Sequence, residues 1–216
     1  MRVGSISYLA LLALCASAAR ADEPLRAVAC SFIPQIESLG GTLFSGGTPV
    51  DPLAFFASNG VNAVRLRVWH SPADGFCGTA RTLALAQRAH AAGLKLVLDI
   101  HYSDSWADPG QQNKPAAWAS LSFSQLAYAV QSYSQSLVQS LVLQGTPPDI
   151  VQIGNEITGG MLWNDGKVSF WGDPNWQNLA TLLKAGITGV HAACPTARIM
   201  LHIDRGGDNP GTRAFF

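Results

Sequence analysis

Hydrophobic and polar positions alternate with a period of two along the segment Val61–His70. The small apolar side chains fall on one face, and the other face carries Arg65, Arg67 and Trp69. Such alternation predicts a β-strand. An arginine-bearing face fits the inside of a barrel near a cluster of carboxylates. The alternative is an exposed edge strand whose arginines are solvated.

The segment Leu94–His101 repeats this pattern, with Asp99 and His101 on the same face as Val97. Polar residues again gather at the carboxyl end of the predicted strand. The remaining predicted strands are apolar and short. They are Leu25–Phe32, a segment that begins at Asp149 and runs to Ile153, and Ala197–Ile203, which carries His202 and Asp204 at its end.

Helices are predicted between these strands from start and stop signals. Asp51-Pro52 opens a short helix, Thr79 is predicted to cap the second, and Ser122 is predicted to cap a long third. Glycines end the second and third helices. The four predicted helices are Leu53–Ser58, Thr79 to Gly93, Ser122 to Gly145, and about Leu179–Ala193.

Alternation of strands and helices predicts a parallel sheet. Neither a GxGxxG segment after the first strand nor a phosphate-binding loop occurs, which disfavours a nucleotide-binding fold. Polar or aromatic residues end four strands in succession, where a TIM barrel builds its active site. The predicted fold class is therefore α/β, a TIM (β/α)8 barrel with only about the first five β/α units present in this chain.

The amino-acid composition argues against some classes of protein. The chain has 216 residues, of which 48% are hydrophobic and 13% charged, with a formal net charge of zero. This balance argues against disorder, and the lack of a basic excess argues against nucleic-acid binding. The length allows one domain with a sizeable core.

The N-terminus has the pattern of a secretory signal peptide. Arg2 precedes a short apolar run, and Ala19-Arg20-Ala21 matches the small-x-small cleavage signal. Residues 1–21 are predicted to be removed, which leaves a secreted chain, extracellular or periplasmic, with no membrane span. A lipoprotein signal at Cys15 is the alternative, disfavoured by Leu14 before it.

Three cysteines remain after cleavage, so at most one pair could form a disulfide in an oxidising compartment. No Cys-x-x-Cys or Cys/His spacing typical of zinc occurs. We expect buried thiols, and we expect neither a cofactor nor a metal. The three are Cys30, Cys77 and Cys194.

Asn155-Glu156 is the strongest candidate for chemistry. Glu156 is the only Glu after Glu37 and follows an apolar strand, where desolvation is expected to raise the pKa of a carboxyl group. A raised pKa suits a general acid near neutral pH. The alternative is a Glu at a strand end that caps a neighbouring loop.

His101 and His202 could be metal ligands, although hydrogen-bonding roles fit them better.

Tryptophans near this strand end favour a polysaccharide substrate, because indole rings stack on the C–H faces of sugars. Glycoside hydrolysis needs two carboxylates, and Glu156 fits the proton donor. No second Glu occurs downstream of it. The carboxylates available as a partner are Asp99, Asp104, Asp204 and Asp208.

Four long blocks in order carry a family resemblance that covers nearly everything after residue 21. The chain resembles the arabinogalactan endo-β-1,4-galactanases of glycoside hydrolase family 53. The blocks are Gly60–Trp69, Gly93–Pro109, Pro148–Trp163 and Met200–Asn209.

The resemblance implies a (β/α)8 barrel and a retaining mechanism, with β-1,4-galactan side chains of pectin as the substrate. It implies that residues 22–216 are the N-terminal part of the catalytic domain. Glu156 then matches the acid/base, Asn155 the partner of the sugar 2-hydroxyl, and Arg65 a group that holds the nucleophile ionised. Other residues implied to line the cleft or bind substrate are Arg67, Trp69, Asp99, His101, Trp106, His202 and Asp204.

Two departures from the family pattern stand out. The Asp that the family has at the end of the first strand is Ala29 here. The family's nucleophile is a Glu on the seventh strand, so the available sequence is expected to be truncated before it and inactive as given. The alternatives are a non-catalytic galactan-binding remnant, or a related barrel acting on mannan or xylan.

Overall fold

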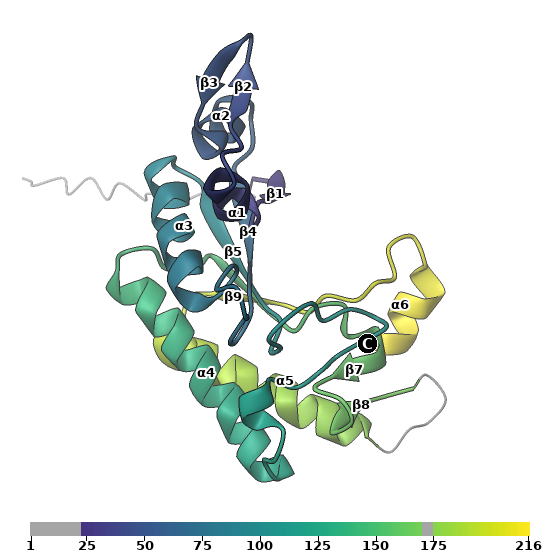
Figure 1. Ribbon diagram of the computed structural model, residues 1–216. Helices are drawn as coiled ribbons and strands as arrows, with labels where there is room; N and C mark the ends of the chain where they lie inside the picture. Colours follow the sequence, from purple (N-terminus) through teal and green to yellow (C-terminus); the bar gives the residue numbers. More distant parts are fainter. Residues whose placement is uncertain (1–22, 170–174) are drawn as a thin grey trace, which may run out of the picture.

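A five-stranded parallel sheet organises the protein (Figure 1). The structure is a computed structural model and describes residues 23–169 and 175–216. The strands follow the order β1-β4-β5-β6-β9, and each neighbouring pair is parallel. Their bounds are Ala27–Ala29 for β1, Ala63–Val68 for β4, Lys95–Ile100 for β5, Ile150–Ile153 for β6 and Arg198–Met200 for β9.

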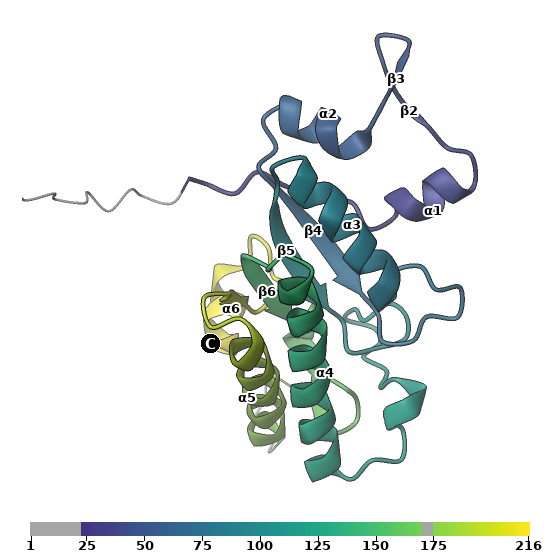
Figure 2. The same ribbon diagram turned by 90° about the vertical axis from the view of Figure 1, so that its left-hand side faces the viewer.

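Three long helices cover one face of this sheet and lie side by side (Figure 2). Their buried side chains pack against the same apolar core as the strands. The alternation of strand and helix therefore confirms the predicted α/β class, with about five units of a (β/α) barrel and a sheet that does not close. The helices are α3 (Thr79–Ala91), α4 (Phe123–Leu143) and α5 (Trp176–Ala193).

Helix ends follow the sequence signals in most cases. Ser122 and Gln125 form a capping box at α4, and Gly145 lies just beyond its end with φ of 85°. The predicted cap at Thr79 is wrong. The N-cap of α3 is Gly78, which has no side chain to cap with, and Thr79 is the first helical residue.

The register of the sheet brings the polar residues together on its other face. Arg67 lies opposite Asp99, and Asp99 lies opposite Gln152 on the next strand. Val64, Leu66 and Val68 are buried on the helix-covered face. Because β4 pairs with both β1 and β5, it is an interior strand, and the edge-strand alternative is wrong.

The edges of the sheet are β1 and β9, and β1 is mostly exposed and shorter than the predicted Leu25–Phe32.

Several small elements were not predicted. A hairpin turns at Gly46 and Gly47, which both have positive φ, as hairpin turns of this kind require. The small elements are α1 (Ile33–Ser38), β2 (Leu43–Ser45), β3 (Thr48–Val50), β7 (Gly160–Met161), β8 (Gly166–Lys167) and α6 (Asn209–Phe215), with α2 (Pro52–Ser58) as predicted.

The three cysteines after residue 21 are buried free thiols, as expected. The predicted signal peptide and Cys15 lie outside the described residues. Among residues 23–169 and 175–216, no helix is both long enough and apolar enough to cross a membrane.

Candidate active site

The end of β6 turns sharply to present Asn155 and Glu156. Gly154 has φ of 78°, and a Cβ there would lie 2.6 Å from the Ile157 side chain, so the turn needs glycine. Glu156 itself is left-handed, with φ of 51° and ψ of 49°. The Ile157 amide donates to the carbonyl of His202 at 2.9 Å, which ties the turn to the end of β9. A non-glycine residue held in this conformation is a feature of functional sites.

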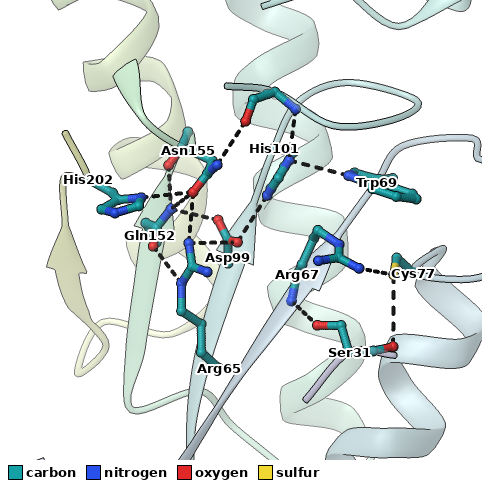
Figure 3. Close-up of polar contacts among 12 residues, drawn as sticks. Ser31, Arg65, Arg67, Trp69, Cys77, Asp99, His101, Gln152, Asn155 and His202 are labelled. Carbon is teal, nitrogen blue, oxygen red and sulfur yellow. Dashed lines mark hydrogen bonds and ion pairs between the residues drawn. The ribbon is translucent and has the colours of Figure 1, made fainter. Parts of the chain in front are cut away.

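Asn155 is buried and its side-chain orientation is determined by its partners (Figure 3). Its Oδ1 accepts hydrogen bonds from Arg65 Nη2 at 2.8 Å and from Gln152 Nε2 at 3.3 Å. Its Nδ2 donates to the carbonyl of Ala107 at 2.8 Å. Because an arginine can only donate, the carboxamide cannot be flipped without loss of both contacts.

Asp99 is a fully buried carboxylate that accepts from three side chains. Arg65 Nη2 lies 2.9 Å from Oδ2, and His101 Nε2 lies 3.1 Å from the same oxygen. Gln152 Nε2 donates to Oδ1 at 2.6 Å. A buried charge persists only when it is paired and its remaining lone pairs are satisfied. Asp99 meets both conditions.

The contacts of His101 determine which ring nitrogen carries the proton. Its Nδ1 receives two N–H donors, Trp69 Nε1 at 3.3 Å and the amide of Ala107 at 3.2 Å. Nδ1 is therefore an acceptor, and Nε2–H donates to Asp99. This arrangement connects an aromatic residue at the end of β4 to the buried carboxylate.

His202 completes the network from the end of β9. Its Nδ1 lies 2.8 Å from Asn155 Oδ1, which can only accept, so Nδ1 carries the proton. Burial lowers the pKa of His202 below its ordinary value, and the charge of Arg65 acts in the same direction. Asp99 and Glu156 oppose this shift. The folded structure therefore favours the neutral imidazole of His202 over the protonated one.

This shift predicts a pH dependence of stability. Because the folded state disfavours protonated His202, the unfolded chain binds more protons once the pH falls below about 6.5. The free energy of unfolding, measured in urea, is expected to fall between pH 7.5 and 5. His70, whose pKa burial also lowers, contributes in the same direction. The fall is expected to be smaller in His202→Gln, and an unchanged fall would contradict this.

The matched control for that measurement is His90→Gln, at an exposed position of α3. It should retain the full fall in stability, because the exposed ring of His90 makes no hydrogen bond within residues 23–169 and 175–216.

Glu156 is partly exposed, and its carboxylate makes no hydrogen bond or ion pair within residues 23–169 and 175–216. Only its backbone is held, through Gln112 Nε2 at 3.4 Å from its carbonyl oxygen. The alternative that Glu156 caps a neighbouring loop is therefore wrong, since a cap would accept from backbone amides. Its carboxylate is therefore accessible from the solvent and is not held by a neighbouring side chain of the described residues.

Gln152 and Gln112 were missed as site residues. Gln152 donates to Asp99 and accepts from Arg65 Nε at 3.0 Å, so it joins β4, β5 and β6. Gln112 Nε2 donates to the Asn155 carbonyl at 2.8 Å. The signal for Gln152 was present, since it is the one polar residue in an apolar, fully buried strand. Nothing in the local sequence distinguishes Gln112.

The other predicted site residues lie at the same end of the sheet but outside this network. Arg67 is buried against Trp69 and Trp106, and Trp106 is 42% exposed. The Thr158 hydroxyl donates a hydrogen bond to the carboxylate of Asp204. In the described part of the chain, no three His, Cys, Asp or Glu side chains lie close enough to hold a metal ion.

A family model described as glycosyl hydrolase family 53 matches residues 25–216. The chain belongs to this family. It is similar to the arabinogalactan endo-beta-1,4-galactanase of Thermothelomyces thermophilus, with 43% identity over 154 residues, covering 70% of this chain and 45% of that relative. The chain spans about half the length of the curated relatives it matches.

Two solved structures of the family are similar to this chain. The Ignisphaera aggregans family 53 catalytic domain superimposes with a TM-score of 0.78 at 39% identity, covering 83% of this chain and 51% of that one. A fungal beta-1,4-galactanase gives a TM-score of 0.83 at 37% identity, covering 89% of this chain and 57% of its own.

The alanine at position 29 affects which carboxylate can pair with Arg65 in this family 53 chain. Ala29 is the register partner of Arg65 on the neighbouring strand, so a carboxylate at that position would face the guanidinium. Here the carboxylate that pairs with Arg65 is Asp99, on the strand at the other side of β4. Asp99 therefore supplies the negative charge beside Arg65, and the side-chain oxygens of Gln152 and Asn155 accept its other hydrogen bonds.

Proposed function

We propose that this protein is an endo-acting glycoside hydrolase that cleaves β-1,4-galactosidic bonds of arabinogalactan by a retaining mechanism, with Glu156 as the acid/base. The observation that best supports this proposal is the contrast between two adjacent side chains. Asn155 is locked by hydrogen bonds from Arg65 and Gln152, whereas the carboxylate of Glu156 is unbonded and partly exposed. A general acid must be positioned yet free to reach the leaving oxygen.

In the first step Glu156 protonates the glycosidic oxygen as the bond to the sugar breaks, while a second carboxylate attacks the anomeric carbon. In the second step Glu156 takes a proton from water, which displaces that carboxylate. Asn155 Nδ2 uses one hydrogen on Ala107, so its other hydrogen is available to the sugar 2-hydroxyl.

The four aspartates considered as the second carboxylate all have other partners. Asp99 is buried under three donors, and Asp204 is bonded to Thr158. Asp104 accepts from the amides of Ser71 and Ala116, and Asp208 caps α6. We therefore propose that the nucleophile belongs to barrel strands beyond β9, where Arg65 would help to keep it ionised. Without it, residues 1–216 alone are expected to be inactive.

The substrate proposal rests on the relatives, which are named as galactanases, and on the exposed ring of Trp106 near the strand ends. A flat apolar ring suits the C–H face of galactose, and Trp69, His101 and His202 line the same end of the sheet. We also propose secretion after cleavage near Ala21, which suits a polymer that cells cannot take up whole. Neither a metal nor a cofactor is part of the mechanism.

The test is an assay of the full-length protein on β-1,4-galactan, β-1,4-mannan and β-1,4-xylan, with release of reducing ends as the measurement. Galactan is expected to be cleaved at least about 100-fold faster than the other two polymers, a discrimination that hydrogen bonds to one hydroxyl can supply. Equal rates on mannan or xylan would refute the galactanase proposal. Retention on a galactan affinity gel without reducing ends would favour the binding-remnant alternative.

A further inference from the structure

A buried glutamine, Gln112, contacts the turn that carries Asn155 and Glu156. It lies in the loop between β5 and the short helix η1 (Ala116–Trp118) and is 1% exposed. Its Nε2 donates to the carbonyl oxygen of Asn155 at 2.8 Å and lies 3.4 Å from the carbonyl oxygen of Glu156. A side-chain amide is buried at low cost only when it is hydrogen-bonded, so these contacts fix its orientation.

The loop that carries Gln112 is itself fixed by hydrogen bonds. The backbones of Asp108 and Gln111 exchange two hydrogen bonds, at 2.8 Å and 3.0 Å. The Asp108 carboxylate accepts from the amides of Gly110 and Gln111, at 2.8 Å and 3.1 Å. The amide of Trp163 donates to the carbonyl of Gln112 at 2.7 Å. A side chain positions another group well only when its own backbone is held, and Gln112 meets this condition.

The turn at Glu156 needs support from the rest of the chain. Glu156 is left-handed, a conformation that costs a residue with a side chain free energy and persists only where surrounding contacts hold it. The Ile157 amide bonds to the His202 carbonyl at 2.9 Å, and Gln112 contacts the turn from another side. Because the Glu156 carboxylate has no hydrogen bond within the part of the chain that the structure describes, its position depends on this backbone.

Asn155 does not depend on Gln112 to the same extent (Figure 3). Its side chain is held by four other groups, at distances of 2.8 to 3.3 Å. These are Arg65, Gln152, His202 and the carbonyl of Ala107. Loss of the Gln112 amide would therefore leave the Asn155 side chain in place and would act mainly on Glu156.

We propose that Gln112 is a positioning residue for the acid/base. By donating to the carbonyls of Asn155 and Glu156, it holds the turn so that the Glu156 carboxyl group faces the leaving oxygen. This inference rests on the proposed function, in which Glu156 is the acid/base. Gln112 transfers no proton itself and acts through Glu156, so its importance for a substrate follows how much the leaving group needs a proton.

The variant Gln112→Met in the full-length protein tests this, because methionine has a similar length and no donor. On β-1,4-galactan, kcat/KM is expected to fall about tenfold to a hundredfold, the loss that a small misplacement causes. On an aryl β-1,4-galactobioside with a good leaving group, it should fall less than about threefold, since that bond breaks without protonation. The ratio of the two values from one sample does not depend on the folded fraction. An unchanged ratio would overturn the proposal.

Two further variants accompany this measurement. Gln111→Met is the matched control, because Gln111 is exposed and its side chain bonds only to the exposed Asp108 carboxylate at 3.1 Å in the described part of the chain. It should keep the parental kcat/KM on both substrates. Gln112→Asn keeps an amide but withdraws it from the carbonyls by one methylene, so the ratio should shift in the same direction as in Gln112→Met. A parental ratio in Gln112→Asn would contradict the proposal.

The double variant distinguishes this inference from the proposed function. Added to Glu156→Gln, the change Gln112→Met should lower kcat/KM on galactan less than about twofold, because no acid remains to be positioned. If Glu156→Gln alone kept the parental rate, the proposed function would fail. If Glu156→Gln is slow and Gln112→Met lowers its rate by the same factor as in the parent, only the role of Gln112 is wrong.

Discussion

Replacement of Glu156 by glutamine is expected to lower kcat of the full-length enzyme on β-1,4-galactan by about a thousandfold, within the range that general acid–base catalysis supplies. The amide has nearly the shape of the carboxyl group but cannot transfer a proton to the leaving oxygen. Folding should be unaffected to within about 0.5 kcal/mol, because the Glu156 carboxylate has no hydrogen bond to lose within residues 23–169 and 175–216.

An aryl galactoside with a good leaving group refines this experiment. Such a substrate needs no protonation, so the Glu156→Gln enzyme should still form the covalent intermediate, and added azide should accelerate its breakdown. Glu37→Gln, an exposed site on α1 whose carboxylate pairs with Arg88, is the control and should keep full activity. If Glu156→Gln keeps more than a tenth of the parent kcat on the polymer, another group is the acid.

Asp99→Asn is expected to destabilise the fold by about 3–5 kcal/mol, the usual cost of breaking a buried ion pair. The substitution leaves Arg65 with an uncompensated charge. It also places an NH₂ group where Gln152 and His101 both donate, so one donor loses its acceptor. The free energy of unfolding, extrapolated from urea titrations, measures this loss.

Asp74→Asn is the control for that measurement. Asp74 lies on an exposed turn and accepts from the amide of Phe76, which an asparagine oxygen can also accept, so a change within about 0.5 kcal/mol is expected. A loss below 1 kcal/mol in Asp99→Asn would mean that Asp99 is not the ionised centre of the network. Activity should fall with stability, since Arg65, which donates to Asn155, loses its carboxylate partner.

Local sequence patterns were sufficient to predict the main strands and helices. The alternation at Val61–His70 and Leu94–His101 predicted β4 and β5, because side-chain alternation is a property of each strand by itself. The same holds for the Ser122 cap and the stop at Gly145. The hairpin β2–β3 was missed because strands of three residues are too short for any period to appear.

The sequence by itself determined the parallel barrel class, the strand end that bears Asn155 and Glu156, and the family. These follow from short-range patterns and from blocks of residues read along the chain. Only the tertiary structure showed which of the two arginines of β4 binds Asp99 and Asn155. Arg65 binds Asp99 and Asn155, whereas Arg67 turns toward Cys77, although both lie on one face of the strand.

Only the tertiary structure, likewise, revealed that Gln152 joins Arg65 to Asp99 and which ring nitrogen carries the proton on each of the two histidines. Each depends on contacts between strands that are tens of residues apart, and on which donors and acceptors burial leaves without water. No pattern within one segment contains that information. Glu156 was identifiable from the chain alone, but that its carboxylate is unbonded was not.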